Sequence, residues 1–145
     1  MIEVDVDSNL MFWFGIVFGA EGQFHRPFIQ AQGRVHIDTV HFMAMSFDSH
    51  SCITMTAGDF TIQANYESSI MSSAVNLTTT GNGAFLSAHA ASVSLNHTMF
   101  VNCSARSGGA VLISDSNSLS VSEIRFVNCS ASADGGAPNE AVDYF

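Results

Sequence analysis

A short motif, Phe-Val-Asn-Cys-Ser-Ala, occurs twice in this chain of 145 residues, at positions 100–105 and 126–131. Each copy is followed by Gly-Gly-Ala, at positions 108–110 and 135–137. The two units are about 26 residues apart, and self-similarity with a period of about 20–50 residues is typical of solenoids, in which each unit stacks on the next. The repeat constrains the fold more than the function, because a solenoid can carry many kinds of site.

Weaker copies of the unit extend upstream. Positions 74–76 match positions 100–102 at the same offset, and positions 83–86 match positions 109–112. Further upstream, positions 58–60 match positions 83–85 at a slightly shorter offset, which aligns Asp59 with Ala84 and Ala110. We therefore expect β-helix repeats over residues 30–137, preceded by residues 1–29 and followed by a C-terminal tail at residues 138–145.

Within a unit, apolar and polar residues alternate in short runs. Val93 and Leu95 alternate with Ser94 and Asn96, and the following unit repeats this pattern. Alternation with a period of two, interrupted by Gly, Ser, Asn and Asp, is typical of β-strands. The pattern predicts an all-β fold, a right-handed parallel β-helix of about four to five coils of ~26 residues. A β-sandwich built from two similar hairpins is the alternative.

In such a stack, each residue lies above its equivalent in the next coil. Phe100 should therefore stack on Phe126, and Asn76, Asn102 and Asn128 should form a column that passes amide hydrogen bonds along the stack. For a buried Phe126, we expect the substitution Phe126→Ala to cost about 3–5 kcal/mol. Glycines should occupy the corners that need a positive φ. The expected turn glycines are Gly83, Gly108, Gly109, Gly135 and Gly136.

The combination of Phe, an Asn two residues later, Ser-Ala, and then Gly-Gly-Ala-Val resembles the repeats of the chlamydial polymorphic outer membrane proteins. Gly108-Gly109-Ala110-Val111 matches the glycine motif of that family, whereas Cys103 and Cys129 stand where its Phe-x-x-Asn motif has Asn, and Pro138 follows the last Gly-Gly-Ala. The resemblance implies a right-handed, pectin-lyase-like β-helix in a secreted or cell-surface protein, with a role as an adhesin or stalk. It implies no catalytic residue.

Composition excludes some partners. The formal net charge is −9, with four arginines and no lysine, so binding to nucleic acid or to an anionic membrane surface is not expected. We expect no cofactor or metal, since the sequence contains no zinc-binding spacing and no phosphate-binding motif. A polysaccharide lyase or hydrolase would need acids that converge from neighbouring coils. In the repeat alignment no two acids stack, because Asp38 aligns with Asn96 and Ser122, and Glu123 with His97.

Two further motifs leave alternatives open. Cys103 and Cys129 occupy the same position in adjacent coils. They could form a disulfide or remain as two small buried thiols. Cys52 would have no cysteine of the same chain left to pair with if they form the disulfide. Four Asn-x-Ser/Thr sequons begin at Asn76, Asn96, Asn102 and Asn128. Asn76 and Asn96 are the candidate glycosylation sites. Asn102 and Asn128 are excluded from glycosylation if they point inward.

The apolar run at positions 10–20 is too short to cross a bilayer as a helix, which needs about 20 residues. A strand or solenoid cap is favoured over a signal-peptide core, because Glu3, Asp5 and Asp7 precede the run. We expect a non-catalytic structural or adhesive segment of an extracellular or cell-surface protein, with a carbohydrate-binding or polysaccharide-cleaving β-helix as the alternative. The chain is also compatible with a fragment of a larger repeat protein. Expected partners are neighbouring coils, further copies bound end to end, glycans, or a host surface.

Overall fold

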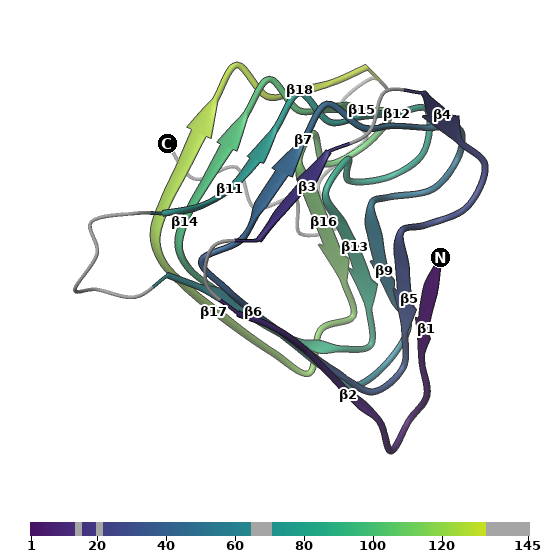
Figure 1. Ribbon diagram of the computed structural model, residues 1–145, viewed down its shortest axis with the longest axis vertical. Coiled ribbons are helices and arrows are strands. Elements are labelled where there is room, and N and C mark those ends of the chain that lie inside the picture. The colour runs from purple at the N-terminus through teal and green to yellow at the C-terminus, as the bar shows by residue number, and fades with distance from the viewer. Residues whose placement is uncertain (14–15, 20–21, 65–70, 133–145) are drawn as a thin grey trace.

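The computed structural model shows a parallel β-helix, and it describes residues 1–13, 16–19, 22–64 and 71–132. Every strand pair among these residues is parallel, and no helix occurs among them. Seen along the stack, the coils superimpose into one closed outline (Figure 1). The predicted parallel β-helix is therefore confirmed, with five coils.

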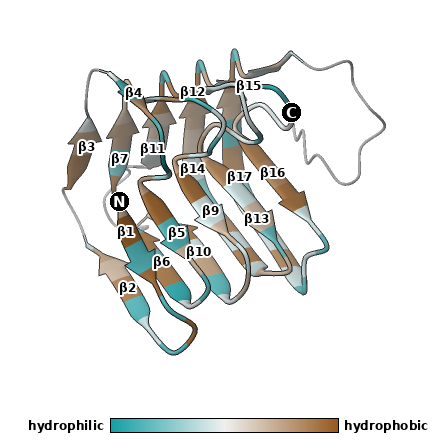
Figure 2. Ribbon diagram, turned by 90° about the vertical axis from the view of Figure 1, so that its right-hand side faces the viewer, coloured by the Kyte–Doolittle hydropathy of each residue, from teal (hydrophilic) through white to brown (hydrophobic). Residues whose placement is uncertain are grey.

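Each coil begins in sheet A. Its five strands, in spatial order, are β1 (Ile2–Val4), β5 (Ile29–Ala31), β9 (Ile53–Met55), β13 (Leu86–His89) and β16 (Val111–Ser114). Figure 2 shows these strands side by side along the stack. Buried and more exposed residues alternate along them, as in β9, where Ile53 and Met55 are buried and Thr54 is only partly covered.

Sheet B is bent into two legs, which form two sides of the outline in Figure 1. The first leg contains β2 (Asn9–Phe12), β6 (Arg34–Asp38) and β10 (Asp59–Gln63), and the second contains β3 (Val17–Gly19), β7 (His41–Met43) and β11 (Ser72–Val75). The long strands β14 (Ser92–Val101) and β17 (Ser118–Val127) run through both legs. At the bend, Thr39, His97 and Glu123 have φ angles of 50°, 48° and 52°.

Sheet C closes each coil with two-residue strands. They are β4 (Gln23–Phe24), β8 (Ser46–Phe47), β12 (Thr78–Thr79), β15 (Ser104–Ala105) and β18 (Ser130–Ala131). Hydroxyl groups lie above one another on the outer face of this sheet, since Thr78 donates to Ser46 at 3.0 Å and Ser130 donates to Ser104 at 3.4 Å. The outer surface of sheet C is therefore polar but uncharged along these columns.

The first coil is part of the same solenoid. β1, β2, β3 and β4 pair in register with β5, β6, β7 and β8, so the β-helix includes the strands before residue 29 as well as those within residues 30–137. The described part of the apolar run at positions 10–20 contributes β2 and β3. The sequence of the first coil shows no match to the later repeats, because inward positions accept any apolar side chain of suitable size.

The third coil contains an insertion that the repeat alignment missed. In the first leg of sheet B, Arg34 pairs with Asp59 across a sequence offset of 25, whereas in the second leg His41 pairs with Ser73 across an offset of 32. The extra residues fall between Gln63 and Ser72. The alignment of Asp59 with Ala84 and Ala110 is therefore wrong, because Asp59 pairs with Arg34 on one side and Ser92 on the other.

Phenylalanines fill the interior along the stack. Phe100 pairs with Phe126, with ring centroids 5.1 Å apart and an interplanar angle of 16°. In the third coil the same column holds Ala74, and the space beside it is taken by Phe85 from the sheet A side. The Phe85 ring lies 5.3 Å from that of Phe42 and 5.5 Å from that of Phe100, so the aromatic column continues across the coil that lacks a phenylalanine.

Candidate functional site

The predicted asparagine column forms an exposed corner between sheets B and C. Ala44, Asn76, Asn102 and Asn128 have φ angles between 52° and 55°, in the left-handed region that Asn enters more readily than most residues. Asn102 Nδ2 donates to Asn76 Oδ1 at 3.0 Å. The three asparagine side chains are exposed and point outward. Glycosylation of Asn102 and Asn128 was excluded only for inward-pointing side chains, so the fold leaves both sequons open to it.

The two candidate glycosylation sites differ in accessibility. Asn76 is exposed, and so is Thr78, the hydroxyl residue of its sequon. Asn96 is partly buried, and Thr98 is fully buried with its hydroxyl donated to the Asn96 carbonyl oxygen at 2.9 Å. The structure makes Asn76 the accessible site of this pair.

The turn glycines lie where the chain enters sheet A. Gly83, Gly108 and Gly109 have φ angles of 49°, 70° and 46°. A Cβ atom on Gly83 would lie 2.1 Å from the Leu86 carbonyl oxygen, so a larger residue would displace the backbone. Gly135 and Gly136 lie outside the described residues, as does the tail at residues 138–145.

All three cysteines are free thiols in the structure. Cys52 and Cys103 are fully buried, whereas Cys129 in the last coil is partly exposed. The hydrogen bond with the Cys129 thiol, together with burial, raises the pKa of Cys103, and burial alone raises the pKa of Cys52. Protonated thiols are poor nucleophiles, so neither buried cysteine is suited to covalent catalysis.

Carboxylates on the outer surface lie beside hydrogen-bond donors of the neighbouring coil. His97 Nδ1 lies 2.7 Å from Glu123, and Arg34 lies 3.4 Å from Asp59. Asp38 pairs in register with Gln63, whose amide donates to it at 3.5 Å. Among the residues that the structure describes, no group of three or more His, Cys, Asp or Glu could hold a metal ion.

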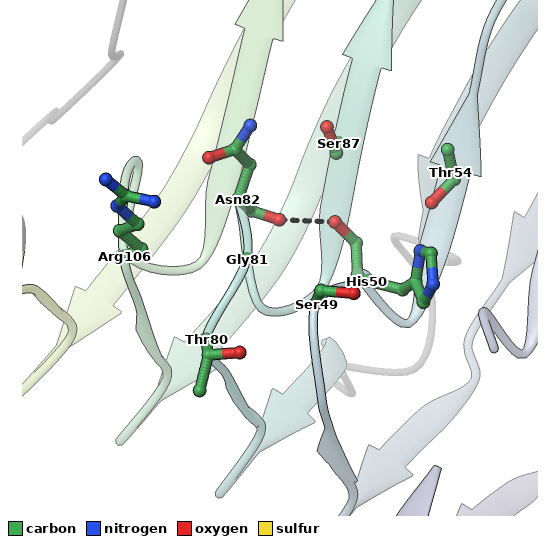
Figure 3. A pocket seen from close by; sticks show the side chains of 9 residues that line it. Ser49, His50, Thr54, Thr80, Gly81, Asn82, Ser87 and Arg106 are labelled. Carbon is green, nitrogen blue, oxygen red and sulfur yellow. Dashed lines mark hydrogen bonds between the residues drawn. The ribbon is translucent and has the colours of Figure 1, made fainter. Parts of the chain in front are cut away.

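A polar hollow of about 340 Å³ lies at the corner between sheets C and A (Figure 3). It crosses three coils, because its lining comes from the segments that follow β8, β12 and β15, with two residues added from sheet A. The lining residues are Ser49, His50, Ser51, Thr54, Thr80, Gly81, Asn82, Ser87 and Arg106. The lining contains no Asp or Glu and no Phe, Tyr or Trp.

Hydrogen bonds between coils hold the floor of this hollow. Arg106 donates from its backbone N–H to the Gly81 carbonyl at 2.8 Å, and Thr79 donates from its hydroxyl to the His50 carbonyl at 2.7 Å. The Ser51 hydroxyl donates to the Asn82 carbonyl. A Cβ atom on Gly81 would lie 2.3 Å from the Ser49 carbonyl oxygen, so only glycine allows this close approach. The site is therefore preformed by the backbone.

The sequence patterns did not indicate this hollow. The repeat itself could have placed two of the lining residues together. Thr78 pairs with Ser104 in sheet C, and Thr80 and Arg106 follow these two residues by two positions each. Polar residues are common in turns, however, and nothing in the sequence indicates that three such turns enclose one space.

No protein-family model, curated protein or solved structure matches this chain. Within the described ranges, no helix is long and apolar enough to cross a membrane.

Proposed function

We propose that the chain is a non-catalytic structural or adhesive segment of a secreted or cell-surface protein, and that it associates end to end with further copies of itself. The observation that carries the end-to-end association is the exposed interior of the last described coil. Leu119 occupies the same inward column as Val93, yet 37% of its surface is exposed against 2% for Val93. An additional coil would cover it.

The first coil has matching residues to offer. Leu10 heads the column that continues through Val35, Phe60 and Val93 to Leu119, and it is only partly buried. Phe18 and Phe126 likewise occupy the two ends of the second-leg column. A second copy placed in register would therefore set Leu10 on Leu119 and Phe18 on Phe126. It would also pair the free outer edge of β17, which pairs only with β14 among the described strands.

Sedimentation of the purified chain over a micromolar concentration range tests this association. We expect the average mass to rise with concentration, and we expect Leu119→Glu to shift the chain toward monomer by placing a charge in the end-to-end contact. Ser120→Glu, which adds the same charge one residue away on the outer face, is the control. A monomer at every concentration would contradict the association, and so would equal effects of the two variants.

The secreted or surface setting is supported by the low charged fraction of 12% and by the exposed sequon at Asn76. The resemblance to polymorphic outer membrane protein repeats points the same way. Protease treatment of intact source cells tests it: the chain should be degraded while a cytoplasmic marker survives. Protection of the chain until the cells are lysed would exclude the setting.

Polysaccharide cleavage is the alternative from a different class. The carboxylates of Glu123 and Asp59 lie beside His97 and Arg34, which is not the arrangement of an acid/base pair. Incubation with a panel of polysaccharides, with and without Ca²⁺, should release no reducing ends. Release of reducing ends by the purified chain would replace the structural proposal with an enzymatic one. The polar hollow favours glycan binding without cleavage over polysaccharide cleavage.

A further inference from the structure

The polar hollow contains hydrogen-bonding side chains that the fold itself does not use. No hydrogen bond or ion pair with another described residue engages the side chains of Ser49, His50, Thr54, Asn82, Ser87 and Arg106. Elsewhere on the same surface, comparable groups are engaged, such as Thr78 with Ser46 and Asn102 with Asn76. Six polar side chains that are free to bind a ligand surround one preformed space, so the hollow is a candidate binding site.

The lining specifies what kind of ligand fits. Arg106 supplies a guanidinium with five N–H donors, and Asn82 supplies an amide N–H₂ group. No carboxylate lines the hollow, so an acceptor-rich ligand meets donors without repulsion from the wall. Figure 3 shows Arg106 beside Asn82 at one end of the row of lining residues and His50 with Thr54 at the other. An anionic group therefore fits best at the Arg106 end.

Hydroxyl groups make up the rest of the contact surface. Ser49, Thr54 and Ser87 can each donate and accept, which suits a polyhydroxylated ligand. No Phe, Tyr or Trp lines the hollow, so a sugar would be held mainly by hydrogen bonds. The volume of about 340 Å³ is near the lower end of the range for small-molecule sites and suits one sugar unit.

The charge of the whole chain limits the number of anionic groups on the ligand. A net charge of −9 repels a polyanion, whereas a single anionic group at Arg106 is attracted locally. We propose that the hollow binds one sugar unit carrying a single oxyanion, a carboxylate or a sulfate ester, on an otherwise neutral glycan. Arg106 and Asn82 bind the oxyanion, and Thr54, Ser87 and His50 bind the ring hydroxyls. The biological meaning of this site rests on the proposed adhesive function.

Binding can be measured by two-dimensional NMR titration of the full chain with glucuronic acid, glucose 6-sulfate and glucose. Both acidic sugars should shift the amide resonances of residues around the hollow, and glucose should bind at least about tenfold more weakly, since a charge-assisted hydrogen bond is lost. Binding of both acids assigns the oxyanion in general. Binding of one alone identifies it as the carboxylate or the sulfate.

Arg106→Gln should weaken acid binding at least about tenfold, as expected for loss of a charge-assisted hydrogen bond. Arg125→Gln is the matched control, because Arg125 is an exposed arginine on β17 outside the hollow and its loss changes the net charge equally. Equal weakening by the two variants would overturn the site, as would glucose binding as well as the acids. A polyuronate that binds more tightly per sugar unit than glucuronic acid would overturn the single-oxyanion preference.

This titration is independent of the end-to-end association. It can be run with the Leu119→Glu variant, so failure of acid binding leaves the structural proposal intact. Acid binding by the unsubstituted chain, together with a monomeric mass of that chain at every concentration, would keep the site and remove the association.

Discussion

Asn102 donates a hydrogen bond of 3.0 Å from its side-chain Nδ2 to Oδ1 of Asn76, which lies directly before it in the stack. Both residues have a positive φ, 52° for Asn102 and 54° for Asn76. The same side chain thus fits the corner backbone of its own coil and bonds to the adjacent coil. This double role explains why the repeat keeps Asn at the corner.

Replacing Asn102 separates these two contributions. Asn102→Ala loses the hydrogen bond and places a Cβ-bearing residue without a polar side chain in the left-handed region, so we expect a loss of about 2–3 kcal/mol in unfolding free energy. Asn102→Gly loses only the hydrogen bond and should cost about 1 kcal/mol. Urea denaturation measures both values. Equal losses for the two variants would show that the backbone conformation contributes nothing.

Ala44 occupies the same corner in the second coil, with a φ of 55° and an exposed side chain. Ala44→Asn should stabilise the fold by about 0.5–1 kcal/mol, because Asn tolerates this conformation better than Ala. Thermal melting of the variant checks the gain. Gln30→Asn, on an exposed position of an ordinary strand, serves as the control and should not raise the melting temperature.

Phe100 and Phe126 should differ in energetic weight although they are equivalent in the repeat. Phe100 is fully buried between neighbouring rings, so Phe100→Ala should cost about 3–5 kcal/mol. Phe126 is only partly buried, since it lies on the last described sheet B strand, and Phe126→Ala should cost about 1–3 kcal/mol. The partial exposure of Phe126 thus lowers the unfolding free-energy cost of Phe126→Ala below the value expected from the repeat alone. Urea denaturation at a concentration where the chain is monomeric is the measurement, and equal costs would mean that Phe126 is covered as well.

The raised thiol pKa values of Cys52 and Cys103 predict a loss of stability at alkaline pH. A thiol in the unfolded chain ionises near pH 8.5, whereas the folded chain keeps both protons above that pH. Stability from these thiols is therefore fully present below about pH 8.5 and falls above it by about 1.4 kcal/mol per pH unit for each thiol. Denaturation series between about pH 7.5 and 10.5 measure the slope. Cys52→Ala should reduce it, and an unchanged slope in that variant would contradict the assignment.

Cys103 and Cys129 should remain reduced when the chain is exposed to mild oxidant. Directly stacked side chains are nearly parallel, whereas a disulfide needs a χ₃ dihedral near 90°. Mass spectrometry after alkylation under denaturing conditions should find all three cysteines modified. A species with only Cys52 alkylated would show that the bridge forms despite this geometry.

The sequence alone was sufficient where identical residues repeat. In a parallel stack a fixed period places each residue above its equivalent, so the repeat period correctly pairs Phe100 with Phe126 and Glu123 with His97. Alternation of apolar and polar residues likewise predicts strands, because neighbouring side chains in a strand face opposite sides. These inferences need only local sequence and a constant coil length.

Only the tertiary structure decided the rest, because it depends on contacts between coils of unequal length. The insertion between Gln63 and Ser72 shifts the register of the third coil, and Phe85 fills the space that Ala74 leaves in the aromatic column. The first coil escapes detection because burial selects apolar character and not identity, so Leu10 and Val35 can share a column. The hollow beside Arg106 exists only because three corners of different sequence are brought to one place by the stacking.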